Sequence, residues 1–574
     1  MQNLLNKTEF LTTDVLIIGG GSSGIWAANE IKKNNKEISV TVVDKGPEKW
    51  GGLLAMSGGD LDAVIPDESV EDWMRDIVYY WDGLCDQELV ERMFTESYQR
   101  LKDYEDMGCK FLYDQNGKLK GVPQRGLNSV KLYLAKDKGC GGEHMAQSIR
   151  KRAEFSGVKQ IGRVLVTDLL EKDNKIIGAV GFHTINGTFY VFQTKAVILA
   201  CGQTGWKTSY MNNTSTGDWL NMSLRIGAKV KNFEFGRVWN VPKDFAWEGQ
   251  TTLLPLGAKF VNQDGEDFMK KYSPIVGANT DPHFTTIGMA LECRKGHGPI
   301  YFDVSNLKFD GNEAILKPNQ GWQLLNYNKL CNLGMDFFKT SSEWYPQLTN
   351  TFGGLVTDID GATNIAGLYA AGTCRSFEPG VYIGGLALSI TATMGVYAGK
   401  AVVRYLEREA EFVPIDENEI EKAKQRLAGY ISDTISITPK NVLDLIRAAI
   451  FPYDVSIIKN EKSLQKAMEE IQRIKMDVLP NLKANDAHTL LKLMEVTNIL
   501  TTSELYLTAS LLRKESRAGH YREDYPNKDE QGGLSWIILS KTDDVITVET
   551  EALPLEKYKY PINGYYSDCF DFSK

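Results

Sequence analysis

The stretch DVLIIGGGSSGIWAANEIKKNNKEISVTVVDKG, residues 14–46, decides the fold of this chain. Residues 14–18 form a short apolar, β-branched run, which predicts a buried parallel strand. The loop at 19–24 matches the pattern G-x-G-x-x-G, and a helix is expected over 25–33. Residues 40–43 predict a second buried strand. This order of strand, glycine loop, helix and strand is typical of a dinucleotide-binding βαβ unit.

Each glycine of the loop has its own task in such a unit. Gly19 permits the tight turn, Gly21 lets the backbone approach a pyrophosphate, and Gly24 lets the helix and strand pack closely. The helix N-terminus offers unpaired N–H groups to the phosphates. Asp44 stands 20 residues after Gly24 and can accept hydrogen bonds from a ribose hydroxyl. An ordinary glycine turn is the alternative, and the position near the N-terminus is more typical of FAD than of NAD proteins.

Composition excludes several classes of protein. The 574 residues are enough for two or three domains, and the net charge of −9 argues against a nucleic-acid-binding protein. The apolar runs are shorter than the ~20 residues of a membrane span, and residues 1–13 lack the features of an export signal. The eight cysteines are scattered without a C-x-x-C pair, which predicts no metal site and a reduced, cytoplasmic location.

Further segments show where the backbone should meet a ligand. Two glycine pairs, Gly51-Gly52 and Gly58-Gly59, predict backbone passing close to a flat molecule, with a mobile loop as the alternative. Amphipathic spacing predicts helical structure over 69–108 and a helix beginning at Gly141. Strands are predicted at 161–166, 176–183, 188–193 and 196–202.

Five motifs together carry a resemblance to a known family. They are residues 14–46, 216–218 (Thr-Gly-Asp), 257–265 (GAKFVNQDG), 367–372 (GLYAAG) and 515–526 (ESRAGHYREDYP). With these motifs the chain resembles the flavoprotein subunits of fumarate reductases and succinate dehydrogenases, a family that includes L-aspartate oxidase and the adenylylsulfate reductase flavoprotein. The resemblance covers roughly residues 12–540. It implies an extended, non-covalently bound FAD.

The resemblance also implies a fold and a set of cofactor-binding residues. The expected class is α/β, with a Rossmann-like FAD-binding domain, an inserted α+β capping domain and a C-terminal helical domain. The predicted bounds are 1–237 and 349–410 (FAD-binding), 238–348 (capping), 411–545 (helical) and 546–574 (aromatic tail). The expected FAD-binding residues are Gly19, Gly21, Ser23, Gly24, Asp44, Lys45, Gly51, Gly52, Ser57, Gly58, Gly59, Val164, Ala200, Gly202, Thr216, Asp218, Gly372, Gly384 and Leu386.

Departures from the family pattern bear on cofactor attachment and substrate. Gly52 stands where the membrane-bound members have the histidine that links FAD covalently, which excludes that linkage. Thr349 and Tyr382 replace a histidine and an arginine of the dicarboxylate site, and the catalytic arginine falls near Pro282-His283. A hydrogen bond to a charged group contributes roughly 1.5–3 kcal/mol, so losing three contacts removes on the order of 5–9 kcal/mol. Fumarate and succinate are therefore not the expected substrates.

Three residues are candidates for catalysis, each with a structural alternative. His283 could protonate the substrate as a general acid, or lie in a surface loop. Tyr382 could donate a phenolic hydrogen bond, or form an apolar wall. Glu143 could line the flavin site, or cap a helix together with His144. Weaker candidates are Arg237 and Trp239 as pocket residues, Arg294 and His297 as structural residues of a turn, and Arg517, His520 and Arg522 as residues that dock the helical domain.

Three functions follow as hypotheses. The first is an FAD-dependent oxidoreductase that transfers a hydride to or from a small organic substrate, most commonly at an activated C=C bond. The second is a reductase of a sulphur oxyanion, which converging basic residues would favour. The third is an electron-transfer subunit of a larger complex. Because the cysteines lack cluster-binding spacing, we expect a separate iron–sulphur (ferredoxin-like) partner, docked on the aromatic tail, with a homo-oligomer as the alternative.

Overall fold

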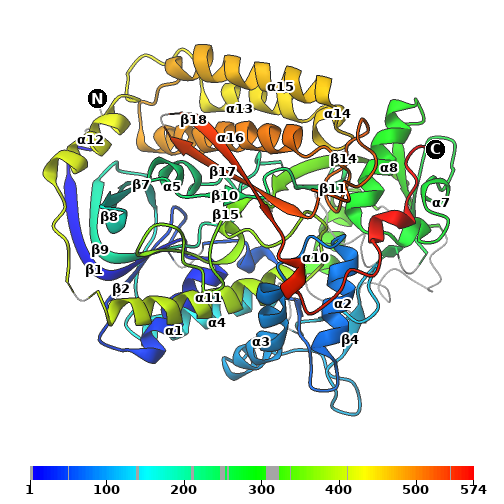
Figure 1. Cartoon of the computed structure of the whole chain (residues 1–574), viewed down its shortest axis with the longest axis horizontal. Helices are drawn as coiled ribbons and strands as arrows, with labels where there is room; N and C mark the ends of the chain where they lie inside the picture. Colours follow the sequence, from blue (N-terminus) through cyan, green and yellow to red (C-terminus); the bar gives the residue numbers. More distant parts are fainter. Residues whose placement is uncertain are drawn as a thin grey trace.

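The computed structural model contains a seven-stranded sheet with the predicted βαβ unit at its centre (Figure 1). The structure describes residues 4–48, 51–136, 141–208, 213–245, 253–254, 257–305, 322–336, 338–409, 411–542 and 544–574. The strands are β1 (Thr8–Ile18), β2 (Val40–Val43), β6 (Lys159–Ile161), β7 (Val164–Lys172), β8 (Lys175–His183), β9 (Phe189–Leu199) and β16 (Leu368–Ala370). Their order is β6-β2-β1-β9-β8-β7, and β16 also pairs with β9. The carboxyl ends of β1, β2, β9 and β16 therefore share one edge, because these strands are parallel.

One long strand replaces the two predicted at 188–193 and 196–202. Strand β1 is 11 residues long, and β9 pairs with it from Phe189 to Leu199. Because β1 pairs with β9 along the whole length of β9, the two predicted strands form one continuous strand. The fully buried run Val15–Ile17 lies in the middle of the domain core, as its apolar sequence predicts.

Two helices cover the sheet beside the glycine loop. They are α1 (Ser22–Asn34) and α11 (Leu386–Leu406), which pack against each other. By length and composition α11 could cross a membrane, contrary to the expectation that no apolar run is long enough. However, 78% of its most apolar window is buried in the protein, as in the core helix of a folded domain.

The predicted helical stretch 69–108 consists of two helices, α2 (Val70–Tyr80) and α3 (Gln87–Asp106). They separate because Asp82 and Gly83 both take positive φ angles, of 48° and 79°, which end the first helix. Asp86 then caps α3 by accepting a hydrogen bond from Leu89 N. A small sheet of order β3-β5-β4 (Leu61–Asp62, Lys131–Tyr133, Gly121–Pro123) and α4 (Gly141–Phe155) complete this part.

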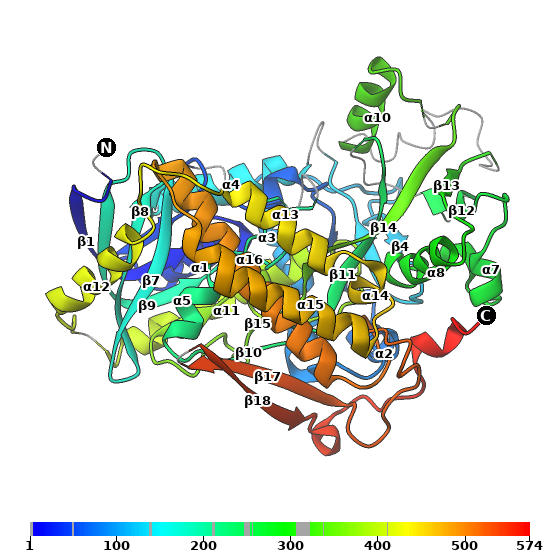
Figure 2. The same ribbon diagram turned by 90° about the horizontal axis from the view of Figure 1, so that it is seen from above.

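The inserted domain is built on an antiparallel sheet of order β11-β14-β13-β12. The sheet begins at Gly236 of β11 and ends at Thr351 of β14, around the region predicted as the capping domain, 238–348. Figure 2 shows it set apart from the main sheet. The elements are β11 (Gly236–Pro242), β12 (Lys259–Val261), α7 (Met269–Tyr272), α8 (Pro282–Arg294), β13 (Ile300–Asp303), α10 (Trp322–Asn332) and β14 (Ser342–Thr351).

The C-terminal region is helical, and it ends in a hairpin that the sequence did not predict. The helices are α12 (Glu417–Ala428), α13 (Pro439–Ile450), α14 (Tyr453–Ser456), α15 (Glu461–Arg473) and α16 (Ala487–Leu512). Strands β17 (Ser535–Thr542) and β18 (Val545–Ala552) extend the short strands β10 (Val230–Lys231) and β15 (Gly354–Leu355) into a four-stranded sheet. Helix α5 (Leu220–Arg225) packs beneath β17. The hairpin thus joins the helical region to the FAD-binding part.

The aromatic tail folds back onto its own chain instead of forming a free surface. Tyr566 is 2% exposed and packs against Tyr80 of α2, with ring centroids 4.7 Å apart. Phe570 stacks on Phe284 of α8 at 4.3 Å. Figures 1 and 2 both show the C-terminus beside α8. The predicted docking of a partner on these rings is therefore not supported, because the capping domain already covers them.

Candidate functional site

Close backbone contacts shape the glycine loop after β1. Gly19 has a φ of 111°, and a Cβ on Gly24 would lie 2.0 Å from Gly19 O, so neither position accepts a side chain. A Cβ on Gly21 would meet only Gly52 Cα, at 3.5 Å. Gly21 is also the N-cap of α1, where no side chain caps the first turn. The uncapped backbone N–H groups at the start of α1, together with the glycine loop before it, suit the binding of a pyrophosphate.

Asp44 fixes the loop and lines a cleft beside it. Its carboxylate accepts hydrogen bonds from Gly20 N and Gly46 N, each at 2.7 Å. Each oxygen keeps a lone pair, so the predicted bond to a ribose hydroxyl remains possible. Arg150 donates to Gly20 O and Gly51 O from the other side. The cleft is lined by Gly20, Val42, Asp44, Glu48, Gly51, Arg150, Gln160, Ile161 and Gly162.

Lys45, a predicted cofactor residue, lies in a buried ionic cluster. Its ammonium contacts Thr216 Oγ1 at 2.6 Å and carboxylate oxygens of Asp218 and Glu495 at 2.8 Å each. The charges of Asp218 and Glu495 raise the pKa of Lys45 against the effect of burial. Glu495 belongs to α16 and also pairs with Lys207. The cluster therefore ties the helical region to the edge of the cofactor site.

The other predicted FAD-binding residues gather at the same edge. Gly59 approaches Gly141, and Gly372, with a φ of 74°, approaches Ser23; a Cβ on either glycine would come within 2.5 Å of its neighbour. Ser57 Oγ donates to Leu54 O. Leu386 is fully buried as the first residue of α11, whose N-cap Gly385 also lacks a side-chain cap. Val164, Ala200 and Gly202 begin or follow strands at this edge, and Gly51, Gly58 and Gly384 lie in the loops around it. These residues fit an extended FAD.

Tyr382 lies at the centre of an aromatic and cationic cluster between the cap and α11. Trp239 of β11 meets its ring edge to face at 5.0 Å. The guanidinium of Arg237 lies 4.3 Å from the centre of the Tyr382 ring. Thr349, expected near the substrate, instead donates to Arg237 O at 3.0 Å. The backbone of Arg237 is thus held by Thr349.

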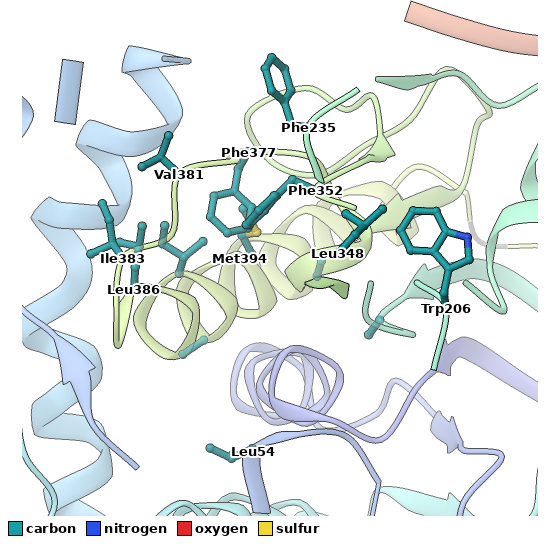
Figure 3. Packing of buried hydrophobic residues seen from close by; sticks show 14 of the residues in the cluster. Leu54, Trp206, Phe235, Leu348, Phe352, Phe377, Val381, Ile383, Leu386 and Met394 are labelled. Atoms are coloured by element: carbon teal, nitrogen blue, oxygen red, sulfur yellow. The ribbon is translucent and has the colours of Figure 1, made fainter. Parts of the chain in front are cut away.

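The segment that carries Tyr382 is anchored by its apolar neighbours. Figure 3 shows Phe377 beside Phe352 and Met394, and Ile383 beside Leu386. Phe377, Val381 and Ile383 are all buried, whereas Tyr382 is partly exposed. Because Tyr382 lies between two buried residues and is itself partly exposed, its side chain points away from the hydrophobic core.

A second guanidinium, Arg125, was missed by the sequence analysis. It donates to Thr280 O at 2.6 Å, at the start of the cap helix α8. It interacts electrostatically with Tyr382 and with Asp281, whose pKa burial raises to about 6. A lone arginine in a short loop between two weak strands carries no sequence signal. Only the fold brings it to the start of α8.

His283 lies in α8, but its environment does not suit a general acid. The side chain is 4% exposed, and neither ring nitrogen has a hydrogen-bond partner among the described residues. Burial, reinforced by the charge of Lys459, lowers the pKa of His283 to about 3. The imidazole is neutral at pH 7, so the expectation that its ordinary pKa fits proton donation is wrong.

The remaining candidates lie apart from Tyr382 or have structural partners. Glu143 accepts a hydrogen bond from Gln147 at 3.1 Å on the first turn of α4. Arg294 pairs with Glu523, and His297 with Asp264, both at the surface. The predicted docking residues are fully buried: Arg517 pairs with Glu515, Arg522 pairs with Asp524, and His520 Nδ1 lies 3.0 Å from Lys459 Nζ.

Comparisons with known proteins match most of the chain to flavoproteins. The FAD binding domain family matches residues 14–388, and the fumarate reductase flavoprotein C-terminal family matches residues 449–564. One polypeptide of the fumarate reductase (CoM/CoB) of Methanothermobacter marburgensis is 28% identical, over 93% of this chain and 98% of its own. L-aspartate oxidase of Yersinia pestis is 26% identical, over 90% and 97%. The solved structure of a mutant FrdA of E. coli quinol fumarate reductase has a TM-score of 0.86 at 22% identity, over 97% of this chain and 99% of its own.

Proposed function

The chain belongs to the family of FAD-dependent oxidoreductases that includes fumarate reductase flavoproteins and L-aspartate oxidases, and from this premise we propose that it reduces an activated C=C bond in a small organic acid other than fumarate. When bound and reduced, FAD would supply a hydride, which carries two electrons, at this site. The protein contributes binding, orientation and a proton. The predicted fold class agrees with that of the solved relative.

The observation that carries the proposal is the guanidinium of Arg237, which lies 4.3 Å from the centre of the Tyr382 ring. Arg125 adds a second positive charge that acts electrostatically on Tyr382. Such a site can hold one anionic group of a substrate and present a phenol to it. Thr349 has its hydroxyl engaged with Arg237 O and Asn350 Oδ1, so it does not supply a second carboxylate contact. A monocarboxylate therefore fits this site better than a dicarboxylate.

A second candidate function is reduction of a sulphur oxyanion. The observation that favours it is the same pair of arginines, because two guanidiniums also suit an oxyanion with several acceptor oxygens. The two functions differ in the compound that oxidises the reduced flavin.

The test is a stopped-flow screen with photoreduced enzyme under anaerobic conditions. The oxidants are a panel of α,β-unsaturated monocarboxylic acids, fumarate, and adenylylsulfate. We expect a monocarboxylate to reoxidise the flavin at least 100-fold faster than fumarate. Fast reoxidation by fumarate would overturn the substrate proposal, and reoxidation by adenylylsulfate alone would establish the second candidate. Arg125→Gln should weaken the response, and Arg152→Gln, on the outer face of α4, is the matched control.

We also propose that electrons reach the flavin from a separate iron–sulphur protein. In the part of the chain that the structure describes, no group of three or more His, Cys, Asp or Glu side chains could hold a metal ion. The relatives include a protein named as one subunit of a fumarate reductase. The purified chain should turn over slowly with NADH alone, and fast turnover would remove the need for a partner.

A further inference from the structure

The indole of Trp239 has a buried N–H group to which the proposed function gives no task. The side chain is 6% exposed, and its Nε1 atom has no hydrogen-bond partner among the described residues. A buried donor without an acceptor costs free energy, and the N–H group of a buried tryptophan usually has a partner. Either the packing here is imperfect or an acceptor binds from outside the chain, and the neighbours of Trp239 decide between the two.

These neighbours are the two residues on which the proposed function rests. Arg237 and Trp239 lie two residues apart on β11, so their side chains share one face of the strand. The guanidinium of Arg237 lies 5.3 Å from the centre of the Trp239 ring and 4.3 Å from that of Tyr382. The rings of Trp239 and Tyr382 meet edge to face, with centroids 5.0 Å apart. Arg237 and Tyr382 are both partly exposed, so a ligand can reach this cluster.

The cluster has donors at two points, and they define the kind of ligand that completes it. A guanidinium and an indole N–H group can only donate hydrogen bonds, so neither can satisfy the other. The charge of Arg237 suits a carboxylate. The indole of Trp239 is neutral and suits a neutral acceptor, because a second carboxylate would be buried against it without a counter-charge. The complementary ligand is therefore an acid with a neutral carbonyl group a few atoms away.

We propose that Trp239 binds the substrate, and that the substrate is an unsaturated monocarboxylic acid with a ketone, ester or amide carbonyl at the far end of its C=C bond. The inference rests on the proposed reduction of such a bond. The carboxylate binds Arg237, and the carbonyl oxygen accepts a hydrogen bond from Trp239 Nε1. Two groups in trans across a planar double bond lie about 3.8 Å apart, as successive Cα atoms do across a trans peptide. One short molecule can therefore reach both side chains, which lie 5.3 Å apart.

The same hydrogen bond assists the reaction. The carbon next to the carboxylate receives a hydride, two electrons with one hydrogen, from the reduced flavin. The electron pair of the C=C bond moves toward the carbonyl, whose oxygen becomes an enolate oxygen and accepts more strongly from Trp239 Nε1. The carbon next to the carbonyl then takes a proton, ultimately from solvent, and the carbonyl forms again. The product is the saturated acid.

Binding can be measured without turnover, from the absorbance of the flavin in the oxidised, FAD-loaded protein. The ligands are monomethyl succinate, which has the neutral carbonyl, and butyrate, which lacks it. We expect the native protein to bind monomethyl succinate about 10-fold more tightly, and Trp239→Phe to lose most of this preference. Equal binding of the two ligands by the native protein, or an unchanged preference in Trp239→Phe, would overturn the inference.

Trp73→Phe is the matched control. Trp73 is fully buried, and its Nε1 atom also has no hydrogen-bond partner among the described residues. Its ring, however, packs on Phe94 in the hydrophobic core, with centroids 5.2 Å apart. The same atoms are removed in both variants, so only Trp239→Phe should change the preference between the two ligands.

The reaction is tested with monomethyl fumarate, crotonate and fumarate as oxidants of the reduced flavin. Monomethyl fumarate should react fastest, and Trp239→Phe should slow it by about 10–100-fold while changing the rate with crotonate by less than about threefold. An equal slowing with both acids would indicate a structural role for Trp239 and overturn the inference. If no unsaturated acid reacts, the proposed function fails, and the binding measurement still decides whether Trp239 holds a carbonyl group.

Discussion

Gly519 and Gly380 meet backbone to backbone. A Cβ on Gly519 would lie 2.5 Å from the Cα and the carbonyl carbon of Gly380, and Gly519 N donates to Pro379 O at 2.9 Å. Gly519 belongs to the late motif of the C-terminal region, whereas Gly380 lies two residues before Tyr382. The motif that docks the helical region therefore also braces the segment that carries the proposed chemistry.

Gly519→Ala should displace this segment. Adding a methyl group against rigid backbone costs about 1–3 kcal/mol, so we expect a lower melting temperature and slower flavin reoxidation by the active unsaturated acid. The control is Gly429→Ala, where the nearest atoms lie 3.5 Å or more from an added Cβ. Equal behaviour of the two variants would show that the contact does not position Tyr382.

FAD should be bound without a covalent link, and Gly52→His should not create one. Acid precipitation of the native protein should leave the flavin in the supernatant. In the variant, a Cβ at position 52 would lie 2.6 Å from Gly21 Cα, so we expect less bound FAD and still no covalent flavin. Gly117→His is the control, since Gly117 has a similar φ of 75° and open space around it. Flavin in the acid pellet would contradict this prediction.

Glu495→Gln should destabilise the protein by about 3–5 kcal/mol, because Lys207 loses the carboxylate with which it pairs and Lys45 keeps only Asp218. Interaction with Lys45 and Lys207 lowers the pKa of Glu495, so its contribution is complete above the ordinary pKa of 4.5 and is lost only as the pH falls well below that value. The difference in melting temperature between the two proteins should therefore stay constant from pH 8 to pH 5. Glu469→Gln, at an exposed site on α15, should change little.

His283 should make folding stability depend on pH below neutrality. Its folded pKa of about 3 lies below its ordinary value of 6.5, so acid protonates the unfolded chain first. This costs about 2 kcal/mol of stability between pH 7.5 and pH 5, and His283→Gln should remove that loss. Melting temperatures across this range provide the measurement. If the rate of flavin reoxidation changed near pH 6.5 in the native protein and not in His283→Gln, His283 would be the general acid after all.

The aromatic tail should hold the capping domain closed. Replacing Phe570 and Phe572 with alanine removes their stacking on Phe284, which lies 4.3 Å and 6.3 Å away by ring centroids. We expect faster cleavage of the cap by a protease and faster reaction of reduced flavin with oxygen. Phe155→Ala is the control, because that ring is 92% exposed. Unchanged rates of cleavage and of flavin oxidation would show that the tail does not hold the capping domain closed.

The sequence predicts the fold of the edge expected to bind the cofactor, because local patterns build it. The loop from Gly19 to Gly24 and the strands beside it are fixed by glycine spacing and apolar runs, and these features are readable along the chain. Arg150 carries a weaker signal, as a charged residue on the buried face of α4.

The substrate side is harder to predict because residues far apart in sequence build it. Arg125 and Arg237 come from a small sheet and the cap, and neither lies in a recognisable motif. The burial that lowers the pKa of His283 also depends on the packing of α8 and Lys459, which sequence spacing does not reveal. The apolar character of α11 and the use of the tail were also hard to read from composition, because both depend on what packs against them.

The tail contacts set an order of events during synthesis of the protein. Asp571 N donates to Tyr272 O, so this contact between the tail and the capping domain needs a residue made late in synthesis. A chain grows from its N-terminus, and the cofactor loop at 19–24 is made more than 500 residues before Asp571. The capping domain is therefore fastened long after the loop has formed. FAD has that interval to enter an open site.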